Sequence, residues 1–364
     1  MDSIYLNNNI YQKLFELISD NQSCVLSTVT ETFGSTPQKA GSSVIVGLSC
    51  LIAGTVGGGI AEQQILEIAT KTIRSKESCY CRFDLNKDVT DEEAGICGGD
   101  MNILLDASPE KHMEVFGQLK ESVKNRIPGV LVSVCESGIN NEFNIERHWV
   151  TQENLSNVTH KLNEEVIECL GKMLQKPVSG DFRKLVKHTS PEYEDNYVFM
   201  ESIVPKSRLI IAGAGHVGKA LSHYGKLLDF EVTIWDSRKD KANKENLPDA
   251  DEILDTDLEK SLGSMTVDRN TYIVIVTHGH KNDADVLKLF IDSPAGYIGM
   301  IGSQRKVAQV REKFIQNGWA DEKKWNRIYA PIGLDIHSKT VQEIALSIAA
   351  QLVQVRFKLN QNHE

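Results

Sequence analysis

The chain has 364 residues, which is long for a single hydrophobic core, so we expect two domains. Its 50 acidic and 40 basic residues give a formal net charge of −10, which argues against the basic stripe of a nucleic-acid-binding surface. No apolar run approaches the ~20 residues of a membrane-spanning helix, and the first residues carry no signal-peptide pattern. We therefore expect a cytoplasmic protein that binds neither nucleic acid nor membrane.

The seven cysteines are an odd number without a repeated CxxC spacing, which indicates neither a disulfide framework nor a zinc site. All of them precede residue 170, so any thiol chemistry is expected in the first half of the chain. Cys79 and Cys81 fall in a predicted strand at 79–85, which places both sulfur atoms on one face. We expect these two cysteines to be structural.

The first half of the chain lacks the series of strand-to-helix turns that follows residue 205. Helices are predicted at 10–18, 60–73, 111–124 and 162–174, and strands at 24–31, 42–46, 51–53, 79–85, 101–105, 129–135 and 143–150. A polar, unpatterned stretch at 191–196 marks the expected boundary. The sequence thus predicts a separate mixed α/β domain at 1–195 and a second domain at 196–364.

Three consecutive glycines, Gly57, Gly58 and Gly59, precede the helix predicted at 60–73. Glycines at a helix start leave several backbone N–H groups uncovered, which suits a phosphate or the polar edge of a ring. A close crossing of one backbone segment against another would need the same residues. The local sequence leaves both interpretations open.

Cys97 differs from the other cysteines because Gly95, Gly98 and Gly99 flank it and leave its sulfur approachable. A thiolate is a nucleophile and a soft metal ligand, so redox, sulfur or metal chemistry is a hypothesis for this residue. The alternative is a small residue that only shapes a turn.

A second glycine-rich turn follows the buried strand predicted at 209–212. Gly213, Gly215 and Gly218 form a GxGxxG pattern, and a helical pattern begins directly after it. Such a turn needs glycine dihedral angles and lets a phosphate approach the N–H groups at the positive end of the helix. The sequence therefore predicts an anion site of the dinucleotide-binding type.

The next predicted strand, at 231–235, ends in Asp236. In a dinucleotide-binding unit an acidic residue at this place binds a ribose hydroxyl. Arg238, two residues further on, is either a partner for a second phosphate or a solvated surface charge. Together with the glycine turn, this pattern predicts a Rossmann-like doubly wound parallel sheet for residues 196–364.

The strand predicted at 272–276 delivers His278, His280 and Asp283 to its carboxyl end, where open α/β sheets bind ligands. These residues could bind a metal or act as acid and base, or the histidines could hydrogen-bond neighbouring loops.

The strand predicted at 296–301 is followed by Gly302 and Ser303 at the start of another helix. Ser303 can cap that helix, and Arg305 and Lys306 add positive charge. We therefore expect a third anion site at the same edge of the sheet.

Seven short motifs follow one another along the chain, and together they resemble one family. They are Phe33-Gly-Ser-Thr-Pro37, Gly57-Gly-Gly59 with Glu62, Ile96-Cys-Gly-Gly99, Gly213-Ala-Gly-His216-Val-Gly218, Thr277-His-x-His280, Gly299-Met-Ile-Gly-Ser303 with Arg305-Lys306, and Pro331-Ile-Gly-Leu-Asp335. The set resembles the XdhC/CoxI family, the xanthine dehydrogenase accessory proteins, over nearly the whole chain.

This resemblance implies a molybdenum cofactor chaperone rather than a catalyst. Such a protein binds molybdopterin or its dinucleotide form, protects it during sulfuration and inserts it into an apo molybdenum hydroxylase. Cys97 matches the family's cysteine implicated in cofactor binding, which makes it the expected reactive residue and a ligand to the cofactor molybdenum. A cysteine desulfurase is an expected partner, and a homodimer is the expected assembly.

The alternative is an NAD(P)-dependent oxidoreductase that uses the same Rossmann fold. Asp236 would then bind the ribose, and His278 or His280 would donate a proton. The two hypotheses share a fold and differ in the ligand.

Overall fold

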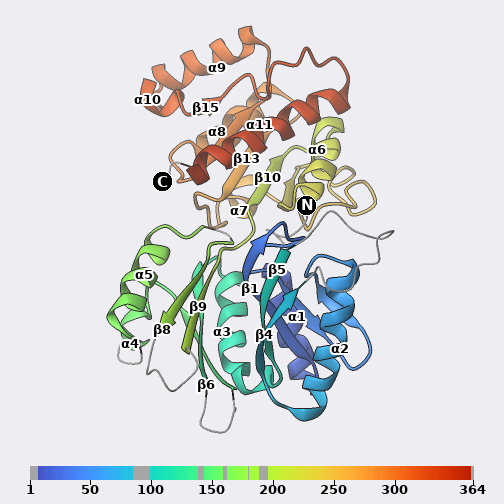
Figure 1. The fold of residues 1–364 in the computed structure, drawn as a ribbon. Coiled ribbons are helices and arrows are strands. Elements are labelled where there is room, and N and C mark those ends of the chain that lie inside the picture. The colour runs from blue at the N-terminus through green and yellow to red at the C-terminus, as the bar shows by residue number, and fades with distance from the viewer. Residues whose placement is uncertain are drawn as a thin grey trace. The chain divides into compact units, whose positions relative to one another are not determined.

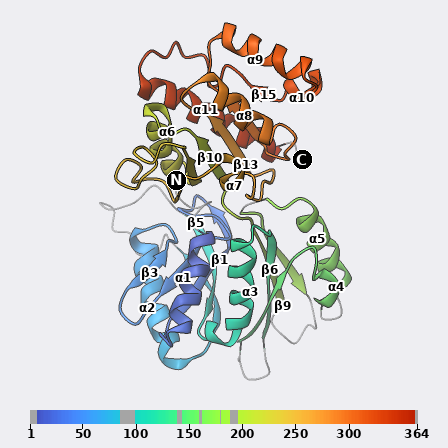
Figure 2. The same cartoon turned by 180° about the vertical axis from the view of Figure 1, so that it is seen from behind.

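The computed structural model describes residues 7–84, 99–137, 143–158, 162–178, 180–187 and 196–361. The chain divides into two compact units, Met1–Pro205 and Lys206–Glu364, which are described separately (Figures 1 and 2). Within the described residues, no helix combines the length and the apolar character that crossing a membrane requires.

The first unit contains two antiparallel sheets. The five-stranded sheet has the order β3-β2-β1-β5-β4, and the four-stranded sheet has the order β7-β6-β9-β8. The strands of the first sheet are β1 (Val25–Gly34), β2 (Ser43–Val46), β3 (Leu51–Gly54), β4 (Cys79–Asp84) and β5 (Gly99–Asp106). Those of the second are β6 (Gly129–Ser137), β7 (Phe143–Val150), β8 (Phe182–Lys187) and β9 (Asn196–Ile203).

Alternation along the strands explains why helices cover both sheets. On β1, Val25 and Val29 pack against α2, while Leu26 packs on the opposite face with α1 and α3. Residues of the second sheet join that same inner cluster, and α5 covers the outer face of β6 and β9. The helices are α1 (Asn7–Ser19), α2 (Gly59–Ser75), the 3₁₀ helix η1 (Pro109–His112), α3 (Met113–Lys124), α4 (Leu155–Val158) and α5 (Glu164–Gln175).

The division between the units lies after β9, whereas the sequence pattern placed the boundary at 195/196. β9 pairs with β6 along seven registered positions, from Gly129 opposite Ile203 to Cys135 opposite Tyr197, and with β8 on its other side. These backbone hydrogen bonds hold β9 in the first unit.

The second unit is a six-stranded sheet with the order β12-β11-β10-β13-β14-β15, in which every neighbouring pair is parallel. This is the strand order of the dinucleotide-binding fold, and it confirms the predicted Rossmann-like sheet. The strands are β10 (Arg208–Ala212), β11 (Glu231–Trp235), β12 (Glu252–Leu254), β13 (Thr271–Ile275), β14 (Tyr297–Met300) and β15 (Ile328–Tyr329).

Helices cover both faces of this sheet, as Figures 1 and 2 show. α6 and α11 pack on one face through a cluster that includes Leu221 and Leu352, and α8 and α9 pack on the other through Leu287 and Phe314. The helices are α6 (His216–Leu227), α7 (Leu258–Ser261), α8 (His280–Phe290), α9 (Gln304–Gln316), α10 (Glu322–Trp325) and α11 (Val341–Gln361). Because both faces are covered, the two central strands β10 and β13 consist of apolar and aromatic residues after their polar first residue.

Candidate functional site

The loops that follow β10, β11, β13 and β14 gather at one edge of the parallel sheet. Neighbouring parallel strands end at the same edge, so residues far apart in the sequence become neighbours there. The strand order reverses between β10 and β13, and open α/β sheets bind their ligands at such a switch point. The candidate site of the second unit is therefore built from these loops.

The structure gives different reasons for a glycine at each of the three positions 213, 215 and 218 after β10. A Cβ on Gly218 would stand less than 3.0 Å from the carbonyl oxygen of Gly213, and one on Gly213 would meet the backbone of Val276 equally closely. Gly215 has an extended backbone that any residue can adopt, and no atom lies within 4 Å of the Cβ position. Packing thus requires glycine at 213 and 218, whereas at 215 it leaves an open cradle beside the N-terminus of α6.

Asp236 is buried and fixes the glycine turn. Its carboxylate accepts hydrogen bonds from the backbone N–H of Ala214 at 2.8 Å and from the backbone N–H of Arg238 at 3.0 Å. The guanidinium of Arg238 adds Nε at 2.9 Å and a terminal nitrogen at 2.7 Å. A carboxylate has about four lone-pair sites, so a ribose hydroxyl would have to displace one of these donors.

Burial opposes ionisation of Asp236, but the hydrogen bonds from Arg238 and Ala214 outweigh it and lower the pKa of this carboxyl. Because the folded-state pKa is depressed, the stabilisation is present above the unfolded pKa of about 3.9 and is lost as pH falls through the folded pKa.

Replacing Asp236 with asparagine should destabilise the second unit by about 2 kcal/mol at pH 7, since it removes hydrogen bonds to a charged acceptor. Urea unfolding at pH 7 and pH 3.5 measures the effect. The difference between the parent protein and Asp236→Asn should shrink at pH 3.5, and an equal difference at both pH values would contradict the assigned role.

The loop after β13 is held by a buried ion pair. Asp283 is fully buried and accepts hydrogen bonds from the backbone N–H of Thr277 at 3.1 Å and from its hydroxyl at 2.6 Å. The ammonium of Lys306 pairs with the other carboxylate oxygen and also donates to the carbonyl of Ile301 at 3.0 Å. Lys306 therefore joins α8 to α9, rather than adding the free positive charge that the sequence suggested.

The remaining predicted contacts at this edge are more exposed. Ser303 caps α9 by accepting a hydrogen bond from the backbone N–H of Lys306 at 3.3 Å, as its position predicted. The side chains of His216, His278 and Arg305 are exposed, and the placement of the His280 side chain lies outside the described part of the chain. Within that part, no group of three metal-ligating side chains comes together.

Two cavities of the second unit lie beside this edge. One of about 480 Å³ runs from His216 along α6, past Lys219 and His223, to the start of α11. The other, of about 320 Å³, lies at the carboxyl ends of β11 and β12 and is lined by Trp235 and Asp255, among others. Both volumes fall in the range that small-molecule sites occupy.

Three glycine motifs of the first unit also converge. Gly34 pairs with Gly99 in the ladder between β1 and β5, and a Cβ on Gly99 would clash with the carbonyl oxygen of Phe33. A Cβ on Gly57 would clash with the ring of Pro37. Gly57 is therefore required by the close approach of the Pro37 side chain, and not by a crossing of two backbone segments.

Gly58, the N-cap of α2, is the open position in this convergence. Its φ is 73° and no atom lies within 4 Å of the Cβ position. The hydroxyl of Thr55 accepts from the N–H of Gly57 at 3.1 Å and donates to Glu62 at 2.7 Å, which fixes the loop. Gly59 begins α2, and Cys97 and Gly98 lie outside the described residues.

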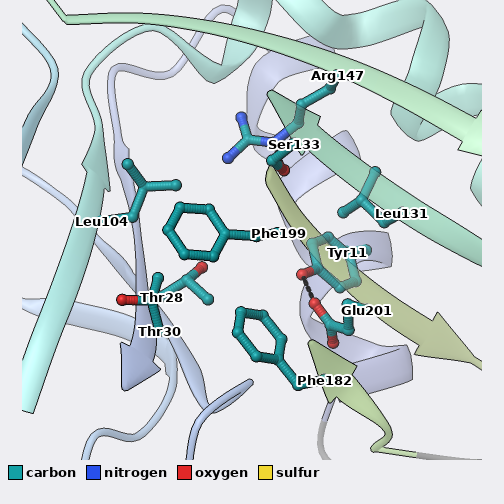
Figure 3. A pocket seen from close by; sticks show the side chains of 10 residues that line it. All are labelled: Tyr11, Thr28, Thr30, Leu104, Leu131, Ser133, Arg147, Phe182, Phe199 and Glu201. Atoms are coloured by element: carbon teal, nitrogen blue, oxygen red, sulfur yellow. Dashed lines mark hydrogen bonds between the residues drawn. The ribbon is translucent and has the colours of Figure 1, made fainter. Parts of the chain in front are cut away.

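A separate polar cavity of about 20 Å³ lies inside the first unit (Figure 3). Tyr11 donates a hydrogen bond of 2.5 Å to Glu201 there, and Phe182 and Phe199 lie close by. Burial, followed by the neighbouring Glu201, raises the pKa of Tyr11. A cavity of this volume holds about one water molecule, so it is part of the core and no cofactor site.

Sequence reasoning did not connect Lys306 with Asp283, or Arg238 with the full carboxylate of Asp236. The link between Asp283 and Lys306 has no local pattern, because the two residues stand on different helices. Arg238 stands only two positions after Asp236, but two alternatives, a phosphate partner and a solvated charge, were considered for it instead. The available signal was an acidic residue in the first turn of α8, at the ligand edge of a parallel sheet.

The fold and the glycine turn define a Rossmann-type α/β protein with a second, antiparallel unit. The XdhC Rossmann domain matches residues 209–352, and the XdhC and CoxI family matches residues 17–84, together more than half of the chain. The chain belongs to the XdhC/CoxI family, which confirms the resemblance inferred from its motifs.

The chain matches one relative over nearly its whole length and two others over only part of theirs. It is 23% identical over 349 residues to a probable xanthine dehydrogenase subunit of Bacillus subtilis, covering 96% of this chain and 98% of that protein. It is 29% identical over 160 residues to the uncharacterized protein YqeB of Escherichia coli, covering 44% of this chain. It is 27% identical over 100 residues to the molybdenum cofactor insertion chaperone PaoD of Escherichia coli, covering 28% of this chain. The last two matches span only 29% and 31% of the relatives' own lengths.

A solved structure supports the fold. The crystal structure of a xanthine dehydrogenase from Bacillus halodurans matches with a TM-score of 0.68 at 21% identity, and the match covers 96% of each chain.

Proposed function

We propose that this protein binds the molybdenum cofactor and serves as an accessory protein for a xanthine dehydrogenase-type molybdenum hydroxylase. Its family supports this role, as do two relatives, one named as a molybdenum cofactor insertion chaperone and the other as a probable xanthine dehydrogenase subunit. In this role it protects the cofactor, supports its sulfuration with a cysteine desulfurase, and inserts it into the client. It acts in the cytoplasm as a homodimer.

The single observation that carries the proposal is the open cradle at Gly215. No protein atom lies within 4 Å of its Cβ position, although its backbone angles suit any residue, so the start of α6 is open to a bound group at this glycine. The N–H groups at the start of α6 would hold a phosphate of molybdopterin or of its dinucleotide form. The residues present therefore fit the cofactor.

When bound, the cofactor supplies a molybdenum centre with sulfur ligands, for which a thiolate is a matching soft ligand. Cys97 is the residue we assign to that contact. Gly99, two residues later, lies against the backbone of Phe33, and Gly58 leaves open space at the start of α2. The other proposed cofactor contacts are Gly57, Gly59, Gly98, Gly213, His216, Gly218, Asp236, Arg238, His278, His280, Gly302, Ser303 and Arg305.

The test compares the full-length parent protein with Gly215→Ala and Cys97→Ser. Each protein is loaded with molybdenum cofactor and passed through a desalting column, and the retained molybdenum and pterin are then measured. We expect each substitution to lower retention at least tenfold while the circular dichroism spectrum stays unchanged. The reason at 215 is a methyl group in the phosphate cradle, and at 97 it is the loss of a soft ligand.

Gly171→Ala is the matched control. Gly171 lies in α5, also with no atom within 4 Å of its Cβ position, so the added methyl group should leave cofactor retention unchanged. Equal retention of molybdenum and pterin by the parent protein and both site variants would contradict the proposal.

The NAD(P)-dependent oxidoreductase remains the alternative outcome of this test. The full set of donors on Asp236 counts against it, because a ribose hydroxyl needs a free acceptor there. NAD(P)-linked turnover by the parent protein that survives Cys97→Ser, together with no cofactor retention, would favour this alternative.

A further inference from the structure

Two cysteines of the first unit form a close pair outside the sites described above. Cys79 and Cys81 lie two positions apart on β4, so their side chains share one face of the strand, and their Sγ atoms are 3.6 Å apart. Both side chains are partly exposed. Alternation along the predicted strand indicated the shared face, but from the sequence we expected both residues to be structural.

The pair lies at the edge of its sheet. β4 is the last strand in the order β3-β2-β1-β5-β4 and pairs only with β5 among the described strands. Its cysteine face packs against the cluster that α2 covers. An edge strand can bend at its free side, so local movement of β4 does not break a second ladder.

The two thiols have different acidities. A hydrogen bond from Cys81, aided by one from Thr72 and opposed by burial, lowers the pKa of Cys79 to about 7. The same hydrogen bond to Cys79 raises the pKa of Cys81. Cys79 is therefore the thiol of the pair that ionises first.

Two buried cysteines outside the pair show that the lowered pKa of Cys79 depends on its neighbour Cys81. Burial raises the pKa of Cys24 to about 11 and that of Cys135 to about 12. A buried apolar setting suppresses the thiolate, and a neighbouring donor restores it.

We propose that Cys79 and Cys81 form a thiol–disulfide exchange pair that reacts with small disulfides of the glutathione type, with Cys79 as the attacking thiolate and Cys81 as the resolving thiol. The site is independent of the proposed cofactor function.

The reaction balances in two steps. The Cys79 thiolate attacks one sulfur of the small disulfide, forms a mixed disulfide and releases one small thiolate. Cys81 then loses its proton to solvent and attacks Sγ of Cys79, which forms the Cys79–Cys81 bond and releases the second thiolate. The two cysteines are oxidised by two electrons, and the small disulfide is reduced to two thiols.

Strand geometry predicts that the product is easily reduced again. Residues two positions apart on an extended strand have Cα atoms about 6.7 Å apart, near the upper limit of about 6.8 Å for a disulfide. Closing the bond must therefore bend β4, and strained disulfides of this kind are the labile, exchangeable ones.

The test uses the full-length protein equilibrated without air in glutathione buffers from fully reduced to mostly oxidised. Samples are quenched with acid, alkylated and digested with trypsin. Cleavage after Lys76 and Arg82 releases residues 77–82, which contain both cysteines and no other. We expect this peptide to become two hydrogens lighter and resistant to alkylation as the buffer becomes oxidising.

Single variants separate the two roles. Cys81→Ser should stop at the mixed disulfide, so residues 77–82 carry one glutathione. Cys79→Ser should react with glutathione disulfide more slowly, because burial still raises the pKa of the remaining thiol after its hydrogen bond to Cys79 is lost. Cys50, an exposed cysteine that is alone in the peptide 40–71, is the internal control and should remain open to alkylation in the buffers that oxidise residues 77–82.

Thr72→Val tests the positioning of the thiolate while the buried side chain keeps its shape. It should move the pH midpoint of Cys79 alkylation upward, which a merely structural threonine would not do. Full alkylation of both cysteines in the most oxidising buffer, or equal reaction rates for Cys79→Ser and Cys81→Ser, would overturn the proposal.

Discussion

Replacing Gly218 with alanine is expected to destabilise the second unit by about 3 kcal/mol, at the upper end of overpacking effects. The new Cβ would stand less than 3.0 Å from the carbonyl oxygen of Gly213, and that atom belongs to the backbone. A flexible side chain could move away, but this carbonyl is fixed because the N–H of Gly213 donates to the carbonyl of Trp235 at 2.7 Å. The glycine turn must therefore open.

Tryptophan fluorescence during urea unfolding can measure this effect in the second unit. Three of the four tryptophans, Trp235, Trp319 and Trp325, lie in that unit, and Trp149→Phe removes the signal of the first unit. Gly215→Ala in the same background is the control and should unfold at the same urea concentration as its parent. A shift of equal size for both alanine variants would show that packing does not distinguish the two glycines.

Replacing Asp106 with alanine is expected to destabilise the first unit by about 4 kcal/mol. Asp106 forms an ion pair with Arg147, and the two side chains are only 3% and 2% exposed. The guanidinium also donates to Ser133 at 3.3 Å and lies over the ring of Phe116. Removing the carboxylate leaves a buried positive charge without its partner, which costs about 3–5 kcal/mol in proteins.

Hydrogen exchange followed by mass spectrometry should locate this loss. Exchange in β5, β6 and β7 should accelerate in Asp106→Ala, whereas the strands of the second unit should be unchanged. Glu168→Gln, which breaks the exposed pair with Lys172, is the matched control and should leave exchange unaltered.

The double variant Asp106→Leu/Arg147→Met should recover much of the stability, because a buried ion pair and an apolar pair of similar volume are often equally stable. No recovery would mean that the hydrogen bonds around Asp106 matter more than its charge.

The local pattern of the sequence determined much of the second unit. The branched residues at 209–212, the glycines at 213 and 218 and the following helical period predict a strand, a tight turn and a helix, and the structure contains all three. These features depend on backbone angles and on periods of two and 3.6 residues, which a single segment encodes by itself.

The chain's tertiary structure decided how the segments pair. The strand at Asn196–Ile203 lies beyond the boundary that the sequence pattern indicated, and only its register with β6 and β8 places it in the first unit. The hydrogen bond from the backbone of Ala214 to Asp236 and the partner of Lys306 were likewise not predicted, since each depends on which groups the fold brings within about 3 Å. Cys79 and Cys81 show both parts at once. Alternation along a strand placed their sulfur atoms on one face, whereas the hydrogen bond from Thr72 to Cys79 arises from the packed position of β4 against α2.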